Sequence, residues 1–211
     1  MKNKINIENW DRKKQFLFFS GFTNPYASVT SVLNVDKIVR IAKKYKISFY
    51  GIMSYVVLKT INEIEAFKYV LEENNIYKYD KINASFSTLD STNAIKFSRT
   101  VDYVSNFKDF ILLFQQAKSE AENSTNIPYK KDFNKCYFTC LPWMRFTAIE
   151  NTMNYKNQDS IPRVCWGKYF LENNQYMIDL SIQCNHAFQD GYHMGLFFNN
   201  LQENINMFDY E

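Results

Sequence analysis

The sequence predicts an α/β or α+β two-layer sandwich. Two observations carry this prediction: strand-like segments are mixed with amphipathic helical segments of ordinary length, and 46% of the residues are hydrophobic, as in a protein with a sizeable core. No repeat, Gly/Ser linker or block of like charge divides the 211 residues, which include only 5 Gly and 4 Pro. We therefore expect one domain over residues 1–211.

The first half of the chain begins with a β-rich segment over residues 27–35, after which Asn34 can cap a helix. The apolar face of this helix is Val35, Ile38, Val39 and Ala42. Residues 49–67 have apolar positions on more than one stripe, which indicates a long helix buried on most sides. Short strands are expected around residues 68–79, 83–89 and 94–103, with turns at 72–75 and 90–93.

In the second half, Ser105 is a candidate cap for a helix with a core-facing stripe of phenylalanines. A loop over residues 123–128 leads to a strand near 135–141. Residues 163–170 and 176–185 then predict a hairpin around a turn at 172–174.

The last strand and helix have the clearest patterns. Apolar Ile178, Leu180, Ile182 and Cys184 alternate with polar residues, and the same parity places His186 on the apolar face. Asp190 is placed to cap a helix. Its apolar positions, spaced three and four residues apart, are Met194, Phe197, Phe198, Leu201 and Ile205.

Composition and charge narrow the function classes. The net charge of +3 is mild and the lysines are scattered among acids, so the basic face of a nucleic-acid-binding protein is missing, whereas a phosphorylated cofactor is compatible. The N-terminus lacks a signal-like apolar region and no apolar run is long enough to span a bilayer, so we expect a cytoplasmic protein with no membrane partner. The four cysteines form no CxxC pair, which favours reduced thiols over disulfides or a metal site.

His186 is the first candidate for chemistry. A lone histidine on an apolar face is more often a hydrogen-bonded core residue. Here it ends a strand before an irregular segment, and Asp190-Gly191 follows four residues later. The neighbouring strands are rich in polar and aromatic residues suited to lining a cleft. His193 lies off the apolar stripe of the helix and is expected at the surface or behind the site.

Short motifs are spread in order over nearly the whole chain. They are Glu8-Asn9-Trp10-Asp11-Arg12-Lys13, Phe49-Tyr50, Leu141-Pro142-Trp143, Gly167-Lys168-Tyr169 and Ser181-Ile182-Gln183, followed by His186-Ala187-Phe188-Gln189-Asp190-Gly191. In these motifs the chain resembles the chloramphenicol acetyltransferases. HxxxDG alone is shared with dihydrolipoyl acyltransferase cores, but the order and spacing of all the motifs are more specific. The resemblance implies a CoA-dependent acyltransferase with a mixed sheet, helices on one face of it, and a homotrimer with active sites between subunits.

The resemblance also implies a role for each matching residue. His186 is the expected general base, which removes a proton from the acceptor hydroxyl as its oxygen attacks the thioester of acetyl-CoA, with no acyl-enzyme. Thr139 stands where the family has a serine that donates to the developing oxyanion. Asp190 is expected to pair with Arg12 and hold the loop that carries His186. Gly191 is expected to allow a tight backbone approach.

The resemblance places the two substrates as well. The expected acceptor-contacting positions are Phe18, Phe19, Tyr137, Arg163 and Cys165. Trp143, Lys168 and Tyr169 match positions of the cofactor tunnel, where a lysine can bind phosphate. No metal is expected.

The acceptor positions depart from the family pattern. Pro25 replaces a usual cysteine, Tyr137 a common asparagine, Cys165 a threonine, and Arg163 an aliphatic residue. Near the base, Asn185 stands in place of a second histidine, and Gln189 in place of a cysteine. The resemblance implies acetyl transfer to a hydroxyl of chloramphenicol, which inactivates the antibiotic, and these departures keep other acceptors open. An acyltransferase for another small alcohol and a non-catalytic ligand-binding relative remain as alternatives.

Overall fold

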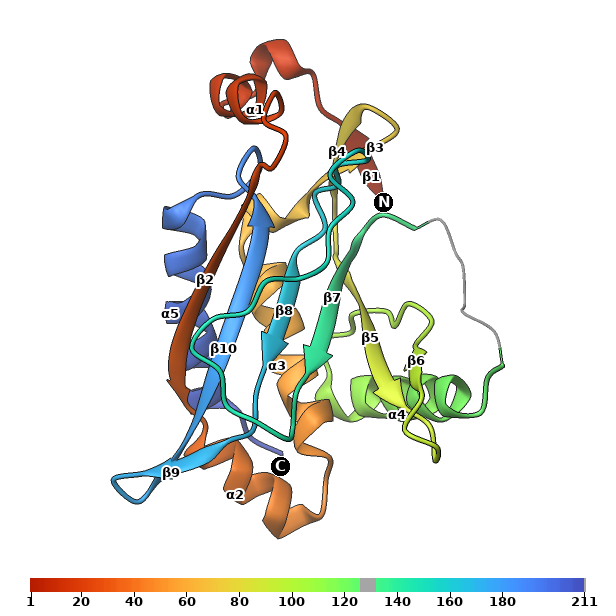
Figure 1. The fold of residues 1–211 in the computed structure, drawn as a ribbon, viewed down its shortest axis with the longest axis vertical. Coiled ribbons are helices and arrows are strands. Elements are labelled where there is room, and N and C mark those ends of the chain that lie inside the picture. Colours follow the sequence, from red (N-terminus) through yellow and green to blue (C-terminus); the bar gives the residue numbers. More distant parts are fainter. Residues whose placement is uncertain (126–131, 211) are drawn as a thin grey trace.

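A mixed β-sheet forms the centre of the computed structural model, which describes residues 1–125 and 132–210 (Figure 1). The strand order is β2-β10-β8-β7-β5-β6; β7 runs parallel to β5 and β8, and the other neighbours are antiparallel. The strands are β2 (Tyr26–Asn34), β5 (Asn83–Leu89), β6 (Ile95–Phe97), β7 (Lys135–Cys140), β8 (Arg163–Trp166) and β10 (Gln175–Asn185). A short strand, β9 (Phe170–Glu172), pairs with β10 through a turn at Asn173 and Asn174, as predicted.

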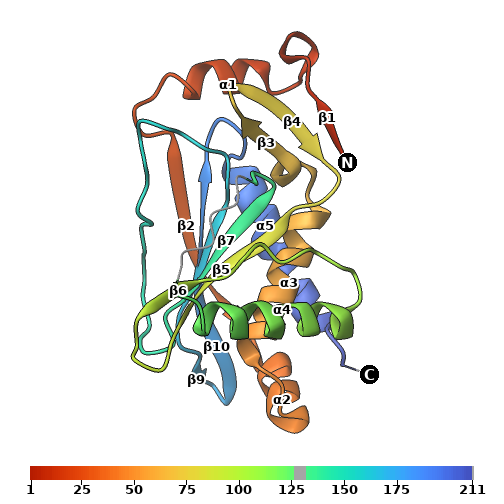
Figure 2. The same cartoon turned by 90° about the vertical axis from the view of Figure 1, so that its right-hand side faces the viewer.

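The long helices lie together on one face of this sheet (Figure 2). They are α2 (Asp36–Tyr45), α3 (Phe49–Glu63), α4 (Phe107–Glu122) and α5 (Gly191–Met207). The connection between β7 and β8, residues 141–162, crosses the opposite face (Figures 1 and 2). The predicted two-layer class, with helices on one face of a mixed sheet, is confirmed.

Strand β10 shows how the sequence pattern builds these layers. Its apolar set Ile178, Leu180, Ile182 and Cys184 is fully buried in the core on the helix side. The alternating polar set, Asp179, Ser181 and Gln183, is also at most 3% exposed. The crossing connection accounts for part of this burial, since Arg145 from it pairs with Asp179.

A smaller antiparallel sheet and helix α1 (Lys13–Phe19) lie at the end of the main sheet where β10 finishes (Figure 1). The smaller sheet contains β1 (Lys2–Lys4), β4 (Asn75–Tyr79) and β3 (Tyr69–Glu72), in that order. The β3–β4 hairpin confirms the strands expected at residues 68–79, whereas α1 and β1 have no counterpart in the sequence prediction. No helix among the described residues is long and apolar enough to cross a membrane.

Several predicted boundaries differ from the structure. Helix α3 ends at Glu63 rather than near residue 67, because Glu65–Lys68 form a separate 3-10 turn. Asn106, not Ser105, caps α4, its side chain accepting from Asp109 N. Asn34 Oδ1 does accept from Asp36 N, but Asn34 lies one residue before Val35, which is the N-cap residue of α2.

Two predicted strands are also shorter or interrupted. The strand expected at 94–103 is reduced to β6 and one bridge at Val101, and that expected at 163–170 is split between β8 and β9. Residues 126–128 of the predicted loop lie outside the described residues.

Candidate active site

His186 lies one residue after β10, in the turn that leads to α5. Its backbone N–H donates to the carbonyl of Pro25 at 2.7 Å. Its half-buried imidazole packs against Phe19 of α1, with ring centroids 4.1 Å apart. Because β10 ends at Asn185, its alternation stops one residue before His186, and the ring is placed by its contact with Phe19.

The two ring nitrogens of His186 have different surroundings. Nδ1 is buried without a hydrogen-bond partner in the part of the chain that the structure describes. Nε2 is therefore the nitrogen open to a substrate.

Three phenylalanines in and just after α1 lie close together, next to His186. Phe18, Phe19 and Phe22 contact one another, with ring centroids 5.0 to 5.4 Å apart, and we call them the aromatic cluster. Phe18 is 63% exposed, which is unusual for a side chain of this size. Phe22 is part of this cluster although no sequence motif indicated it.

Arg12 and Asp190 form the ion pair that the resemblance implied. Arg12 Nη1 lies 2.9 Å from Asp190 Oδ2, and Arg12 Nη2 donates to the carbonyl of His186 at 3.5 Å. The two side chains are 13% and 31% exposed, so the pair is only partly buried. Arg12 thereby ties the start of α1 to both ends of the His186 turn.

His193 completes this arrangement. The Asp190 side chain accepts from the backbone N–H groups of Tyr192 and His193, and His193 Nδ1 lies 2.7 Å from Asp190 Oδ1, in a capping box. The helix cap predicted for Asp190 is confirmed and coexists with the ion pair. The partnership of His193 with Asp190 was missed, because the usual residue at this position of a capping box is Glu or Gln.

The environment of Asp190 favours its ionised form. Burial alone raises the pKa of a carboxyl group, but the hydrogen bond from Arg12 and the interactions with His193 outweigh it and lower the pKa of Asp190 to about 2. The carboxylate therefore stabilises the folded state above its unfolded pKa of about 4, and this contribution disappears as the pH falls through about 2.

We expect Arg12→Ala to lower the free energy of unfolding at pH 7 by about 1.5 to 3 kcal/mol, since a partly buried carboxylate loses a charged donor. Urea unfolding followed by circular dichroism between pH 7 and pH 2 measures it. The difference from the wild type should shrink as the pH falls below about 4. Equal unfolding free energies at pH 7 would show that the pair contributes nothing to stability.

Gly191 does not have the expected role. A Cβ atom added there meets no atom within 4 Å, and the residue does not have a positive φ. Within this chain, neither a close approach nor the backbone conformation requires glycine at this position.

Thr139 and Tyr137 line an open pocket of about 690 Å³ beside strands β5 to β8. Both project from β7 on the face opposite the helix-side core, and Arg163 from β8 stands beside Tyr137. Ile95 and Phe97 of β6 form its apolar wall. The structure therefore brings two of the predicted acceptor-contacting residues, Tyr137 and Arg163, together with the predicted oxyanion donor Thr139.

Cys165 and Arg163 do more than line the acceptor site, or do not line it at all. Cys165 pairs with Thr139 in the sheet but is fully buried, does not line this pocket, and has its thiol pKa raised to about 12 by burial. Arg163 makes a two-pronged ion pair with Asp159, at 3.0 and 2.8 Å. Its charge is thus already balanced within the chain.

Of the three residues predicted to bind the cofactor, only Trp143 and Lys168 lie near each other. The backbone N–H of Lys168 donates to the carbonyl of Met144 at 2.9 Å, which brings exposed Lys168 next to the segment of Trp143, itself 66% exposed. Gly167 is required for this approach, because a Cβ there would lie 2.8 Å from the Met144 oxygen. The ring of Tyr169 instead packs against Phe49.

Sequence reasoning missed the contact that anchors this segment. Arg145 Nε and Nη2 lie 2.9 and 3.2 Å from the two carboxylate oxygens of the buried Asp179. The Arg145 guanidinium also stacks on Phe170, 3.3 Å from the ring centroid. An alternating acid in a strand and an arginine in an irregular connection carry no joint sequence signal.

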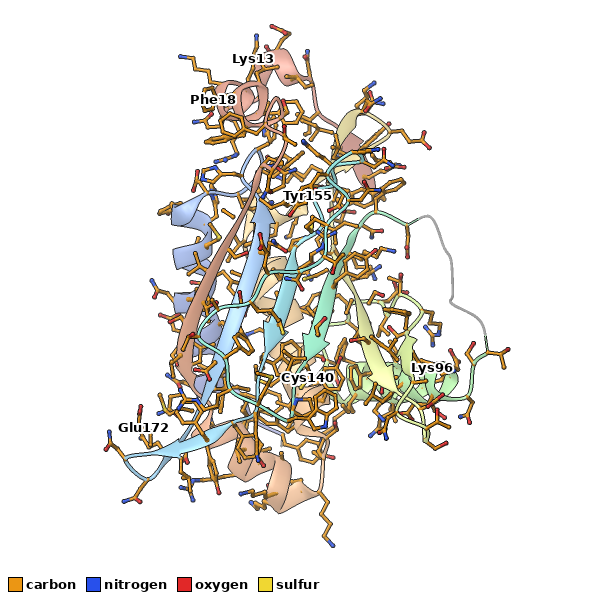
Figure 3. All side chains as sticks on the ribbon, in the orientation of Figure 1. Lys13, Phe18, Lys96, Cys140, Tyr155 and Glu172 are labelled. Atoms are coloured by element: carbon orange, nitrogen blue, oxygen red, sulfur yellow. The ribbon has the colours of Figure 1, made fainter. Side chains whose placement is uncertain are left out.

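His186 and Thr139 are far apart within one chain. Thr139 pairs with Cys165 and Cys165 with Ser181, so Thr139 lies level with Ser181 of β10. His186 is five residues further along at roughly 3.3 Å per residue, and two strand spacings of about 4.8 Å add to this, giving about 19 Å. Figure 3 labels Phe18 of α1 near the end of the sheet where β10 finishes, and Cys140, which follows Thr139 in the sequence, towards the other end.

The described residues contain no group of three or more His, Cys, Asp or Glu side chains placed to hold a metal ion. The candidate site offers the imidazole of His186, the hydroxyl of Thr139 in a pocket, and exposed cationic and aromatic side chains.

A model of the chloramphenicol acetyltransferase family matches residues 1–202. A chloramphenicol acetyltransferase of Staphylococcus aureus is 25% identical over 210 residues, covering 98% of this chain and 97% of that protein. One from Clostridium perfringens is 26% identical over 204 residues, covering 95% of this chain and 93% of that protein. A solved chloramphenicol acetyltransferase structure has a TM-score of 0.86 at 24% identity, covering 97% of this chain and all of that chain (100%), and so shows the same fold.

Proposed function

The chain belongs to the chloramphenicol acetyltransferase family, and we propose that it transfers the acetyl group of acetyl-CoA to a hydroxyl of chloramphenicol, inactivating the antibiotic. The observation that carries this proposal is the turn at His186: an imidazole with one open nitrogen, held by Phe19 and by the Arg12–Asp190 pair. A non-catalytic relative has no need for this arrangement.

His186 acts as the general base in the proposed reaction. Its Nε2 accepts the acceptor's hydroxyl proton while the oxygen attacks the thioester carbonyl. Thr139 Oγ1 donates to the oxyanion of the tetrahedral intermediate. The intermediate then expels the CoA thiolate, which takes the proton from His186, and ester and thiol leave with the enzyme unchanged.

A second copy of the chain is needed to complete this site. Base and oxyanion donor are about 19 Å apart in one chain, too far for one reacting carbonyl. Apolar side chains are exposed near each half: Phe18 and Phe22 near His186, and Ile95 and Phe97 beside the Thr139 pocket. Two different patches that meet between copies make a heterologous contact, which generates a ring when the rotation between copies closes. We propose the homotrimer that the family resemblance implies.

Acetyl-CoA is the proposed cosubstrate, with its phosphates near Lys168 and its pantetheine or adenine portion along Trp143. A lysine offers a point charge to phosphate, and an exposed indole offers apolar surface. All four cysteines are free, which fits the proposed cytoplasmic location.

The test is a thiol-release assay with acetyl-CoA and chloramphenicol, with mass spectrometry of the product. We expect CoA release that depends on chloramphenicol and yields its acetyl ester. The pair Arg163–Asp159 and the bulky Tyr137 in the acceptor pocket favour a second candidate, acetylation of another small alcohol. Release with such an alcohol but none with chloramphenicol would select it, and no release with any acceptor would contradict both.

A further inference from the structure

The residue before the proposed base holds the whole turn together. Asn185 ends β10 and is 2% exposed. Its Oδ1 accepts from Ala187 N at 3.0 Å, so its side chain spans His186 in an Asx-type turn. Its carbonyl accepts from the backbone N–H groups of Phe188 and Gln189, at 2.9 and 3.0 Å. Three of the next four residues are therefore hydrogen-bonded to Asn185.

The other end of the Asn185 amide is anchored on a rigid part of the fold. Nδ2 donates to the carbonyl of Asp159 at 2.9 Å. The hydroxyl of Tyr26, on β2, donates to the same carbonyl at 3.1 Å and accepts from Asp159 N at 2.8 Å. The Asp159 carboxylate is held by Arg163 of β8. Asp159 is thus fixed by two strands, and Asn185 uses both of its amide atoms.

The His186 ring has few direct contacts that set its direction. Nδ1 has no hydrogen-bond partner among residues 1–125 and 132–210, and the ring contact with Phe19 fixes only one face. The orientation of Nε2 therefore depends on the backbone of the turn. We infer that Asn185, anchored on Asp159, is a positioning residue for His186. This inference rests on the proposed role of His186 as the base.

The test compares Asn185→Ala with Asn62→Ala. Asn62 is a matched control: it is 8% exposed, and its amide makes two 2.8 Å hydrogen bonds with the backbone of Ile82, away from His186. Asn185→Ala should lower kcat about 10- to 100-fold, as a displacement of about 1 Å does, with KM for acetyl-CoA changed by less than about threefold. Asn62→Ala should lose comparable stability but change kcat by less than about threefold.

A second variant and a substrate-free measurement keep the inference testable. Asn185→Asp keeps the acceptor for Ala187 N but replaces the donor to Asp159 by a carboxylate oxygen, so it should also lower kcat, and circular dichroism checks that it is folded. The chain has only two histidines, so imidazole NMR signals are assignable with His186→Ala. Both Asn185 variants should shift the His186 signals, whereas Asn62→Ala should not.

The outcomes separate the inference from the proposed function. An unchanged kcat and unshifted His186 signals in folded Asn185→Ala or Asn185→Asp would overturn the positioning role, even in an active acetyltransferase. If the wild-type chain releases no CoA with any acceptor, the proposed function fails. The NMR comparison then still decides whether Asn185 orients the His186 ring.

Discussion

Replacing His186 by alanine is expected to lower kcat for acetyl transfer by about 10² to 10⁴, the usual contribution of a positioned general base. An alcohol is a poor nucleophile at neutral pH, and without the imidazole no group of the turn takes its proton. The fold should survive, because the ring is half-buried and packs mainly against Phe19. Steady-state thiol release at saturating acetyl-CoA measures the effect, and circular dichroism checks the fold.

His193→Gln is the matched comparison for this variant. Gln at the same helical position can complete a capping box with Asp190, so the cap is kept while the second imidazole is removed. We expect its kcat to stay within about tenfold of the wild type, well above that of His186→Ala. Turnover of His186→Ala within about fivefold of the wild type would show that His186 is not the base.

The second large effect is expected for Thr139→Val, which removes the hydroxyl while keeping a β-branched side chain in the strand. Loss of one oxyanion donor lowers kcat by about 10² to 10³. KM for both substrates should change little, because the hydrogen bond strengthens only as the carbonyl oxygen becomes negative. Initial rates over a matrix of both substrate concentrations separate the two parameters.

Thr139→Ser is the control, since it keeps a hydroxyl and removes only the methyl group. Its kcat should remain near that of the wild type. If Thr139→Val and Thr139→Ser were equally active, the hydroxyl would have no part in catalysis, and the oxyanion would need another donor.

The sequence predicts β10 and α5 well because each has a strong local period, two in the strand and three to four in the helix. The burial of Asp179, Ser181 and Gln183 was not predictable, because the connection that crosses that face of the sheet has no regular pattern. Helix α1 was missed for a similar reason: none of its side chains is buried, so it has no core-facing stripe.

The site was predictable only where the family resemblance supplied long-range information. Arg12 and Asp190 are 178 residues apart, and no local pattern pairs them. The resemblance did not supply three other contacts of the structure, namely Asp159 with Arg163, Arg145 with Asp179, and His193 with Asp190. A close backbone approach was also expected at Gly191, but the chain does not show one. A matching motif identifies a residue and does not report which atoms surround it.

The central claim is that one chain supplies His186 and another supplies Thr139. The most direct measurement mixes His186→Ala and Thr139→Val chains in equal amounts, by denaturation and joint refolding, and assays thiol release. In a ring, each mixed trimer has one intact site, so we predict recovery to about a quarter of the wild-type activity from two nearly inactive parents. If mixed oligomers form but activity stays at the level of the parents, both residues act within one chain and the claim is contradicted.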